Sequence, residues 1–142
     1  MTPYRDIPVG ELLPQQPPFR FVDTLELWSE AEARVSFTPA PGNLLMEGKR
    51  LSATGLLEHM AQASAVRAGY FCKYILHRPV KIGYIGQIRN FRLYRLPEAG
   101  ERLDTSVFFR EEAFNITLVE VEVRCGDKLL ATASLKTALK DD

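Results

Sequence analysis

The stretch at residues 54–75, TGLLEHMAQASAVRAGYFCKYI, decides the fold. It is the one long segment with a helical pattern, and Ser52 just before it and Thr54 at its start are both suitable N-cap residues. Apolar or small residues occupy nearly every face of this helix, which is typical of a helix buried on several sides. At about 1.5 Å per residue it would span roughly 30 Å, the width of a small domain. We therefore expect a long central helix that other elements must cover.

The segments on both sides of this helix alternate between apolar and polar residues, a pattern that predicts half-buried strands. A short helical turn is expected at 6–13. The predicted strands are 19–28 and 30–38 before the helix, and 79–88, 90–96, 102–110, 114–124 and 128–138 after it. Residues 125–127 have the composition of a tight hairpin. The pattern predicts one α+β domain over 1–142, with an antiparallel sheet of about six strands curled around the helix and residues 140–142 frayed at its end.

The composition excludes several classes of protein. The chain is 46% hydrophobic, enough for a core, and its 18 basic residues equal its 18 acidic ones, which argues against bulk binding to nucleic acid or membranes. No apolar run has the length of a membrane span or of a signal-peptide core. The two cysteines, Cys72 and Cys125, form no CxxC motif and no zinc-type cluster. We therefore expect no metal, and two free thiols indicate the cytoplasm.

Three motifs stand in order along the chain. The first is LLPQQPPF at 12–19, followed by Val22-Asp23; the second is GLLEHMAQA at 55–63; the third combines GYIG at 83–86 with the turn PEAG at 97–100. Together they resemble the 3-hydroxyacyl-ACP dehydratases of the FabZ type, where ACP is acyl carrier protein. Within that family the chain is similar to the branch of aryl-polyene and flexirubin-type pathways. The resemblance covers nearly the whole chain and implies a hotdog fold.

The resemblance also implies a chemistry and partners. The substrate would be an acyl thioester on ACP in fatty-acid or polyene synthesis, no cofactor would be needed, and the chain would form a homodimer or pair with another hotdog subunit. ACP is acidic, so the expected docking cations are Lys49, Arg50, Arg89, Arg92 and Arg95. Charge runs are more often solvated faces, which is the alternative interpretation of these five residues.

Dehydration of a 3-hydroxyacyl thioester needs a base for the C2 proton, an acid for the C3 hydroxyl, and donors for the thioester carbonyl. The resemblance carries the catalytic carboxylate over to Glu58. The alternative is that Glu58 only favours the helix dipole. In the family the residue after LLP is the catalytic histidine, but here that position is Gln15, and an amide does not titrate near neutrality.

Four explanations of Gln15 are open. Glu58 could be the sole acid–base group, with Gln15 of one subunit facing Glu58 of another. His59 could substitute, although neighbouring helix positions are about 100° apart, so it should point away from Glu58. A partner subunit could supply the histidine. The chain could instead be an inactive subunit that binds acyl-ACP. His77 is expected in a surface loop.

Four further residues are candidates for substrate binding. The Gly55 N–H at the helix start could receive a carbonyl oxygen, or the glycine could merely ease entry into the helix. Gln62, one turn after Glu58, could hold the carboxylate or satisfy a buried backbone group. Gly83 and Gly86 could let an acyl chain pass close to a strand, or mark a bulge in a curled sheet. A thioesterase, in which Glu58 activates water, is the rival enzyme class.

Overall fold

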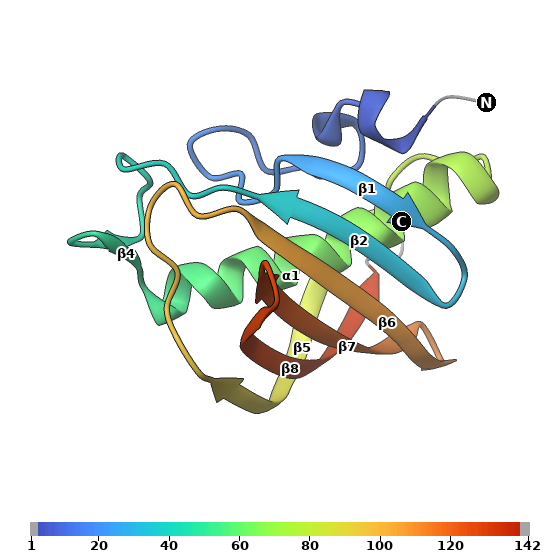
Figure 1. The fold of residues 1–142 in the computed structure, drawn as a ribbon. Helices are drawn as coiled ribbons and strands as arrows, with labels where there is room; N and C mark the ends of the chain where they lie inside the picture. Colours follow the sequence, from blue (N-terminus) through green and yellow to red (C-terminus); the bar gives the residue numbers. More distant parts are fainter. Residues whose placement is uncertain (1–2, 140–142) are drawn as a thin grey trace.

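The computed structural model describes residues 3–139, and the predicted fraying of 140–142 lies outside them. One long helix crosses the concave side of a six-stranded antiparallel sheet (Figure 1). The elements in chain order are η1 (Tyr4–Asp6), η2 (Val9–Glu11), β1 (Thr24–Trp28), β2 (Glu32–Phe37), β3 (Met46–Glu47), β4 (Arg50–Leu51), α1 (Ala53–Tyr70), η3 (Phe71–Ile75), β5 (Gly83–Leu93), β6 (Leu103–Ala113), β7 (Ile116–Cys125) and β8 (Lys128–Leu139). The predicted α+β architecture of the hotdog fold is confirmed.

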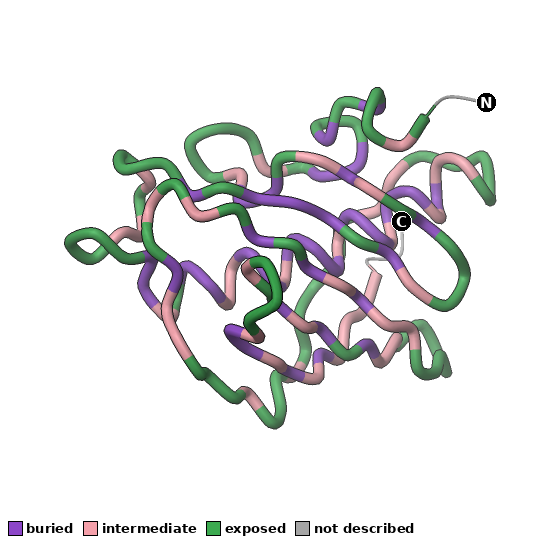
Figure 2. The backbone as a smooth tube through the Cα atoms, in the orientation of Figure 1, coloured by how far each residue is buried: buried purple, intermediate pink, exposed green. Residues whose placement is uncertain are grey.

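The central helix begins where its capping residue predicts. The Ser52 hydroxyl accepts a hydrogen bond from the Gly55 N–H at 3.0 Å, which satisfies one of the free donors of the first turn. α1 ends at Tyr70, and one wider turn, η3, continues it to Ile75. Residues such as Leu56, Met60 and Ala63 are fully buried, and Figure 2 shows α1 buried along much of its length. The buried helix requires a sheet that wraps it.

The sheet has the strand order β1-β2-β6-β7-β8-β5, with every neighbouring pair antiparallel. Alternate residues of the inner strands face the helix, and these positions are buried: Val35 on β2, Val107 on β6, Val121 on β7 and Ala133 on β8. The hairpin between β7 and β8 turns through Gly126 and Asp127, and Gly126 has a φ of +60°. The turn therefore uses the positive φ that glycine adopts without steric cost.

Two strand predictions needed correction. Of the predicted strand 19–28, only Thr24–Trp28 is a strand, because the Phe21 N–H and carbonyl hydrogen-bond to the α1 side chains Gln62 and His59 instead of a neighbouring strand. The predicted strands 79–88 and 90–96 are one strand, β5, in which the pairing with β8 shifts between Arg89 and Arg92 around Asn90, whose φ is +55°. The two-residue strands β3 and β4 had no sequence signal.

The two edges of the sheet differ. β1 lies beside the N-terminal turns, and the Tyr4 hydroxyl donates to the Trp28 carbonyl at 3.0 Å. β5 pairs only with β8, and most of its residues are exposed, including Ile85 and Ile88 on the side that faces the helix. β5 is therefore the open edge of the sheet.

Candidate active site

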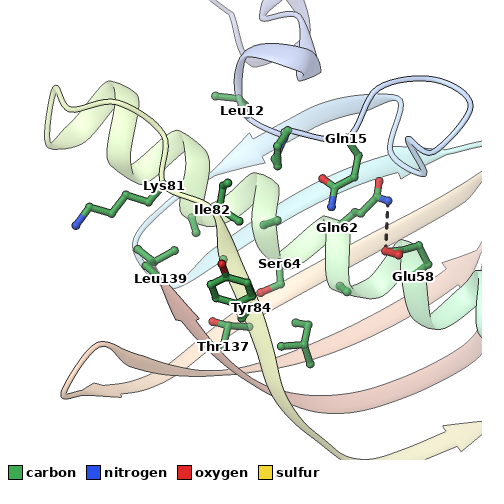
Figure 3. A pocket seen from close by; sticks show the side chains of 16 residues that line it. Leu12, Gln15, Glu58, Gln62, Ser64, Lys81, Ile82, Tyr84, Thr137 and Leu139 are labelled. Atoms are coloured by element: carbon green, nitrogen blue, oxygen red, sulfur yellow. Dashed lines mark hydrogen bonds between the residues drawn. The ribbon is translucent and has the colours of Figure 1, made fainter. Parts of the chain in front are cut away.

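A cavity of about 140 Å³ lies between α1, the loop before β1, the start of β5 and the end of β8 (Figure 3). Glu58 and Gln62 are one turn apart on the α1 face that borders it, and Ala61, Ala65 and Ala68 continue that face. These alanines have no side chain beyond Cβ, so they leave the space open. The cavity thus has a carboxylate at one end and a mostly apolar wall along the helix.

The proline-rich segment 12–19 forms a corner that brings Gln15 to the same cavity. The corner approaches the helix at Gly69, where a Cβ would lie 2.2 Å from the Leu12 carbonyl oxygen. Only glycine permits this approach. At its other end, the Gln15 carbonyl accepts a hydrogen bond from Arg20 Nε at 3.1 Å. Gln15 and Glu58, expected to meet across two subunits, therefore line one cavity within a single chain.

The side-chain oxygen of Gln15 has an unusual environment. Its Oε1 atom is buried and has no hydrogen-bond partner among the described residues. Buried polar atoms are normally paired, so a buried acceptor at a cavity wall marks a position where a bound group with a donor would be favourable. Figure 3 shows the Gln15 amide on the same side of the cavity as Gln62 and Glu58.

Gln62 makes three contacts at once. Its Oε1 accepts from the Phe21 N–H at 2.6 Å, and its Nε2 donates to the Phe19 carbonyl at 2.8 Å. The same Nε2 donates to Glu58 Oε2 at 3.4 Å. Gln62 therefore makes both of the contacts considered from the sequence, one with buried backbone groups and one with the carboxylate.

His59 points away from the cavity, as its helical position predicts. Its ring is fully buried, with Nδ1 2.7 Å from the Phe21 carbonyl and Nε2 2.7 Å from the Thr105 hydroxyl. A carbonyl only accepts, so Nδ1 carries the proton and Nε2 accepts from Thr105. Burial lowers the pKa of His59 to about 4, against a smaller raising effect of the Phe21 carbonyl. His59 is therefore a neutral structural group near pH 7.

Other candidate residues are distributed differently. Gly83 lines the cavity, whereas Gly86 does not; Gly86 stands at a register shift of β5 between Ile85 and Gln87. Gly55 lies outside the cavity, and its N–H is bonded to Ser52. A Cβ at Gly55 would lie 2.6 Å from Leu51 Cδ1, so close packing accounts for this glycine. His77 is exposed after η3, as predicted.

The five predicted docking cations lie on different elements and differ in their contacts. Lys49 and Arg50 are exposed around the β3–β4 hairpin, while Arg89 and Arg92 are exposed on β5. Arg95 instead makes a bidentate ion pair with Glu101, with Nη1 to Oε1 at 2.7 Å and Nη2 to Oε2 at 3.1 Å. This pairing, with a backbone N–H from Glu98, lowers the pKa of Glu101 to about 2. Arg95 is thus engaged within the chain.

Four polar residues of the cavity were not singled out from the sequence. They are Ser64, Lys81, Tyr84 and Thr137. Ser64 follows from helical spacing, because it lies three residues after Ala61 and four before Ala68, which also line the cavity. The others come from the lead-in to β5, from β5 and from β8, and only the pairing of these strands brings them to α1.

The described residues 3–139 contain no group of three or more His, Cys, Asp or Glu side chains arranged to hold a metal ion. Within the same range, no helix is both long enough and apolar enough to cross a membrane.

One long helix against a curled six-stranded antiparallel sheet defines a hotdog protein, and its cavity holds a carboxylate and two amides. The chain belongs to the ApeP-like family, described as ApeP dehydratase, whose model matches residues 7–142. The resemblance to FabZ-like dehydratases of the aryl-polyene branch is thereby confirmed. The comparison with curated proteins gave no match.

Solved structures support the same fold. The dehydratase heterocomplex ApeI:P from Xenorhabdus doucetiae matches with a TM-score of 0.82 at 21% identity, covering 97% of this chain and 94% of that chain. The uncharacterized protein PH1136 from Pyrococcus horikoshii matches with a TM-score of 0.70 at 14% identity, covering 96% of each chain. A hypothetical thioesterase protein with coenzyme A from Streptococcus pneumoniae TIGR4 has a TM-score of 0.66 at 9% identity, with 83% and 85% covered. At these identities the matches show the fold alone.

Proposed function

We propose that this chain is a 3-hydroxyacyl-ACP dehydratase subunit of fatty-acid or polyene biosynthesis, with Glu58 as its acid–base group. The observation that carries the proposal is the meeting of Glu58, Gln62 and Gln15 at one cavity. The apolar helix wall beside Glu58 suits an acyl chain. Both cysteines are free thiols, which supports the cytoplasm as the compartment.

In the proposed reaction, the Glu58 carboxylate removes the C2 proton of the substrate. The C3–O bond then breaks, the C2–C3 double bond forms, and the proton from Glu58 leaves with the hydroxyl as water. The amide N–H of Gln15 donates to the thioester carbonyl while negative charge develops on its oxygen. The Gln62 amide orients the carboxylate through its 3.4 Å contact. No cofactor takes part, and Gln15 needs no titration in this scheme.

We further propose that the active assembly contains two hotdog chains joined at β5. The open edge of β5 and the exposed Ile85 and Ile88 support such pairing, because unpaired strand edges and apolar side chains are otherwise an aggregation hazard. The similar ApeI:P structure is a dehydratase heterocomplex. That relationship favours a second candidate function, in which this chain is the non-catalytic partner that binds acyl-ACP beside an active hotdog subunit.

The docking of acidic ACP is proposed at the exposed cations Lys49, Arg50, Arg89 and Arg92, without Arg95 because of its ion pair with Glu101. We propose that the acyl chain passes Gly83, which lines the cavity. Gly55 and Gly86 lie outside the cavity and are not proposed to contact the substrate. The thioester itself would lie near Glu58, Gln62 and Gln15.

The deciding experiment is an assay of the purified chain with 3-hydroxyacyl-ACP, alone and with a second hotdog chain. We expect enoyl-ACP from the wild type and a loss of kcat of about 100-fold or more in Glu58→Gln, the scale of general acid–base catalysis. Glu30→Gln, at an exposed carboxylate outside the cavity, is the matched control and should keep wild-type activity.

The other outcomes identify the rival functions. If activity appears only in Gln15→His or only with a second chain, the self-sufficient dehydratase is excluded. If the pair of chains stays active with Glu58→Gln in this chain, the chain is the non-catalytic partner. Free acid and ACP thiol as products would identify a thioesterase.

A further inference from the structure

We infer that His59 is a positioning residue of the active site: through the Phe21 carbonyl it holds the segment that carries the Gln15 corner over Glu58. The inference rests on the proposed function for its catalytic consequence. The structural basis of the inference is a series of contacts that connects the buried face of α1, where His59 lies, to the cavity.

The first step is the way α1 holds the segment 19–21. Both backbone polar groups of Phe21 bond to α1. Its N–H donates to Gln62 Oε1 at 2.6 Å, and its carbonyl accepts from His59 Nδ1 at 2.7 Å. The Phe19 carbonyl accepts from Gln62 Nε2 at 2.8 Å. These backbone groups have no strand partner, since β1 begins only at Thr24. Two helix side chains therefore replace the strand pairing that 19–21 lacks.

The second step is the rigidity of His59 itself. Its Nε2 accepts from the Thr105 hydroxyl of β6 at 2.7 Å, and its ring stacks on Phe37 with centroids 5.1 Å apart. Phe37 in turn stacks on Phe21 at 5.7 Å. Because both ring nitrogens are hydrogen-bonded and the ring packs against Phe37, the His59 ring is held in one orientation. Its Nδ1–H therefore offers the Phe21 carbonyl a fixed donor.

The third step connects this segment to Gln15. Arg20 lies between Phe19 and Phe21, so its backbone is held by the same contacts, and its Nε donates to the Gln15 carbonyl at 3.1 Å. The Arg20 guanidinium also covers Gly10, where a Cβ would lie 2.8 Å from NH2. The contacts thus run from His59 to Phe21, through Arg20, to the backbone of Gln15. A displacement of about 1 Å at a catalytic group can reduce a rate by about 100-fold, so this chain of contacts matters for the reaction.

Two substitutions of His59 separate positioning from burial. In His59→Asn, the side-chain nitrogen stands where Nδ1 stood and can still donate to the Phe21 carbonyl, but the Thr105 contact is lost. In His59→Gln, the longer side chain reaches toward Thr105, and the Phe21 contact is lost. Both variants bury one amide, so their stabilities should be similar. We expect kcat within about threefold of the wild type for His59→Asn, and about 10- to 100-fold lower for His59→Gln, with KM changed less.

Arg20→Met tests the connecting step without changing the core. We expect it to lower kcat by about 10-fold while the midpoint of urea unfolding stays close to that of the wild type. Val66→Ala shortens a buried apolar side chain of α1 and serves as the control for destabilisation alone. It should lower the unfolding midpoint and leave kcat unchanged under native conditions.

A second measurement does not depend on activity. The NMR signal of the Gln15 side-chain amide, assigned by its loss in Gln15→His, should shift in His59→Gln and Arg20→Met and stay in place in His59→Asn and Val66→Ala. Equal kcat and equal Gln15 shifts in the two His59 variants would overturn the inference. If the wild type shows no turnover, only the proposal of a self-sufficient dehydratase is excluded. The NMR signal of the Gln15 amide in the His59 variants then decides whether His59 positions the corner.

Discussion

The polar side chains of α1 have separate roles that depend on where each lies. Glu58 borders the cavity, Gln62 joins the cavity to the backbone of the corner, and His59 is enclosed between α1, β2 and β6. Sequence spacing distinguished these positions, because residues four apart share a face and adjacent residues do not. The contacts of His59 with Phe21 and Thr105 were not predictable, since they join residues 38 and 46 positions apart.

The burial of His59 predicts a pH dependence of stability. Its pKa is about 4 in the folded chain and 6.5 in its ordinary state, so between these values the unfolded chain binds more protons than the folded one. Stability from this group is complete above pH 6.5 and is lost as the pH falls toward 4. At 1.36 kcal/mol per pKa unit the loss is about 3 kcal/mol.

Urea unfolding at pH 7 and pH 4 measures this effect. The free energy of unfolding should fall by about 3 kcal/mol more in the wild type than in His59→Asn, which has no titrating group at this position. Carboxylates, including Glu101 with its lowered pKa, titrate in both proteins and cancel in the difference. Parallel pH profiles in the two proteins would contradict the assignment of the lowered pKa to His59.

At the scale of elements, the two ends of the corner are attached to α1 by different means. Phe19 and Phe21 are attached by hydrogen bonds, whereas Leu12 is attached by close contact with Gly69. Gly69→Ala should therefore destabilise the protein despite the better helix propensity of alanine. The new Cβ would lie 2.2 Å from a backbone oxygen, which cannot move as the end of a side chain can. We expect a loss of about 1–3 kcal/mol, the usual range for overpacking.

The matched control for Gly69→Ala is Gly42→Ala, since nothing lies within 4 Å of a Cβ at Gly42. Its free energy of unfolding should stay within about 0.5 kcal/mol of the wild type. Chemical denaturation of both variants checks the pair. An equal stability of Gly69→Ala and the wild type would show that the corner can leave the helix without cost.

The elements also show how far the sequence predicts the structure. Long segments with a clear period were predicted well, because residues 53–70 repeat as a buried helix and β6, β7 and β8 alternate. The motif at 12–19 was identified from the sequence, but its close approach to α1 at Gly69 was not. The predicted strand at 19–23 was wrong because its alternation of Phe19 and Phe21 also fits a segment held by Gln62. Tyr84 and Thr137 of the cavity depend on β5 pairing with β8, which no local pattern specifies.

At the scale of the whole molecule, the open edge is the feature that a single chain leaves unexplained. β5 carries Ile85 and Ile88, 37% and 42% exposed, on the side of the sheet that faces the helix. At the opposite edge, Tyr4 covers the backbone of Trp28. This difference between the edges predicts that the interface with a second chain forms at β5 and not at β1, whether that chain is identical or another hotdog subunit.

Ile88→Lys should therefore convert the assembly to single chains, because a cation and its hydration shell would have to be buried at the new interface. Sedimentation velocity, alone and with the second hotdog chain, measures the change. Leu27→Lys is the matched control: Leu27 is 38% exposed on β1, nearly as much as Ile88, and its substitution should leave the assembly intact. If Leu27→Lys dissociates the assembly and Ile88→Lys does not, the interface lies at β1. If the wild type stays a single chain both alone and with the second hotdog chain, β5 is an edge that its own bulges at Gly86 and Asn90 protect.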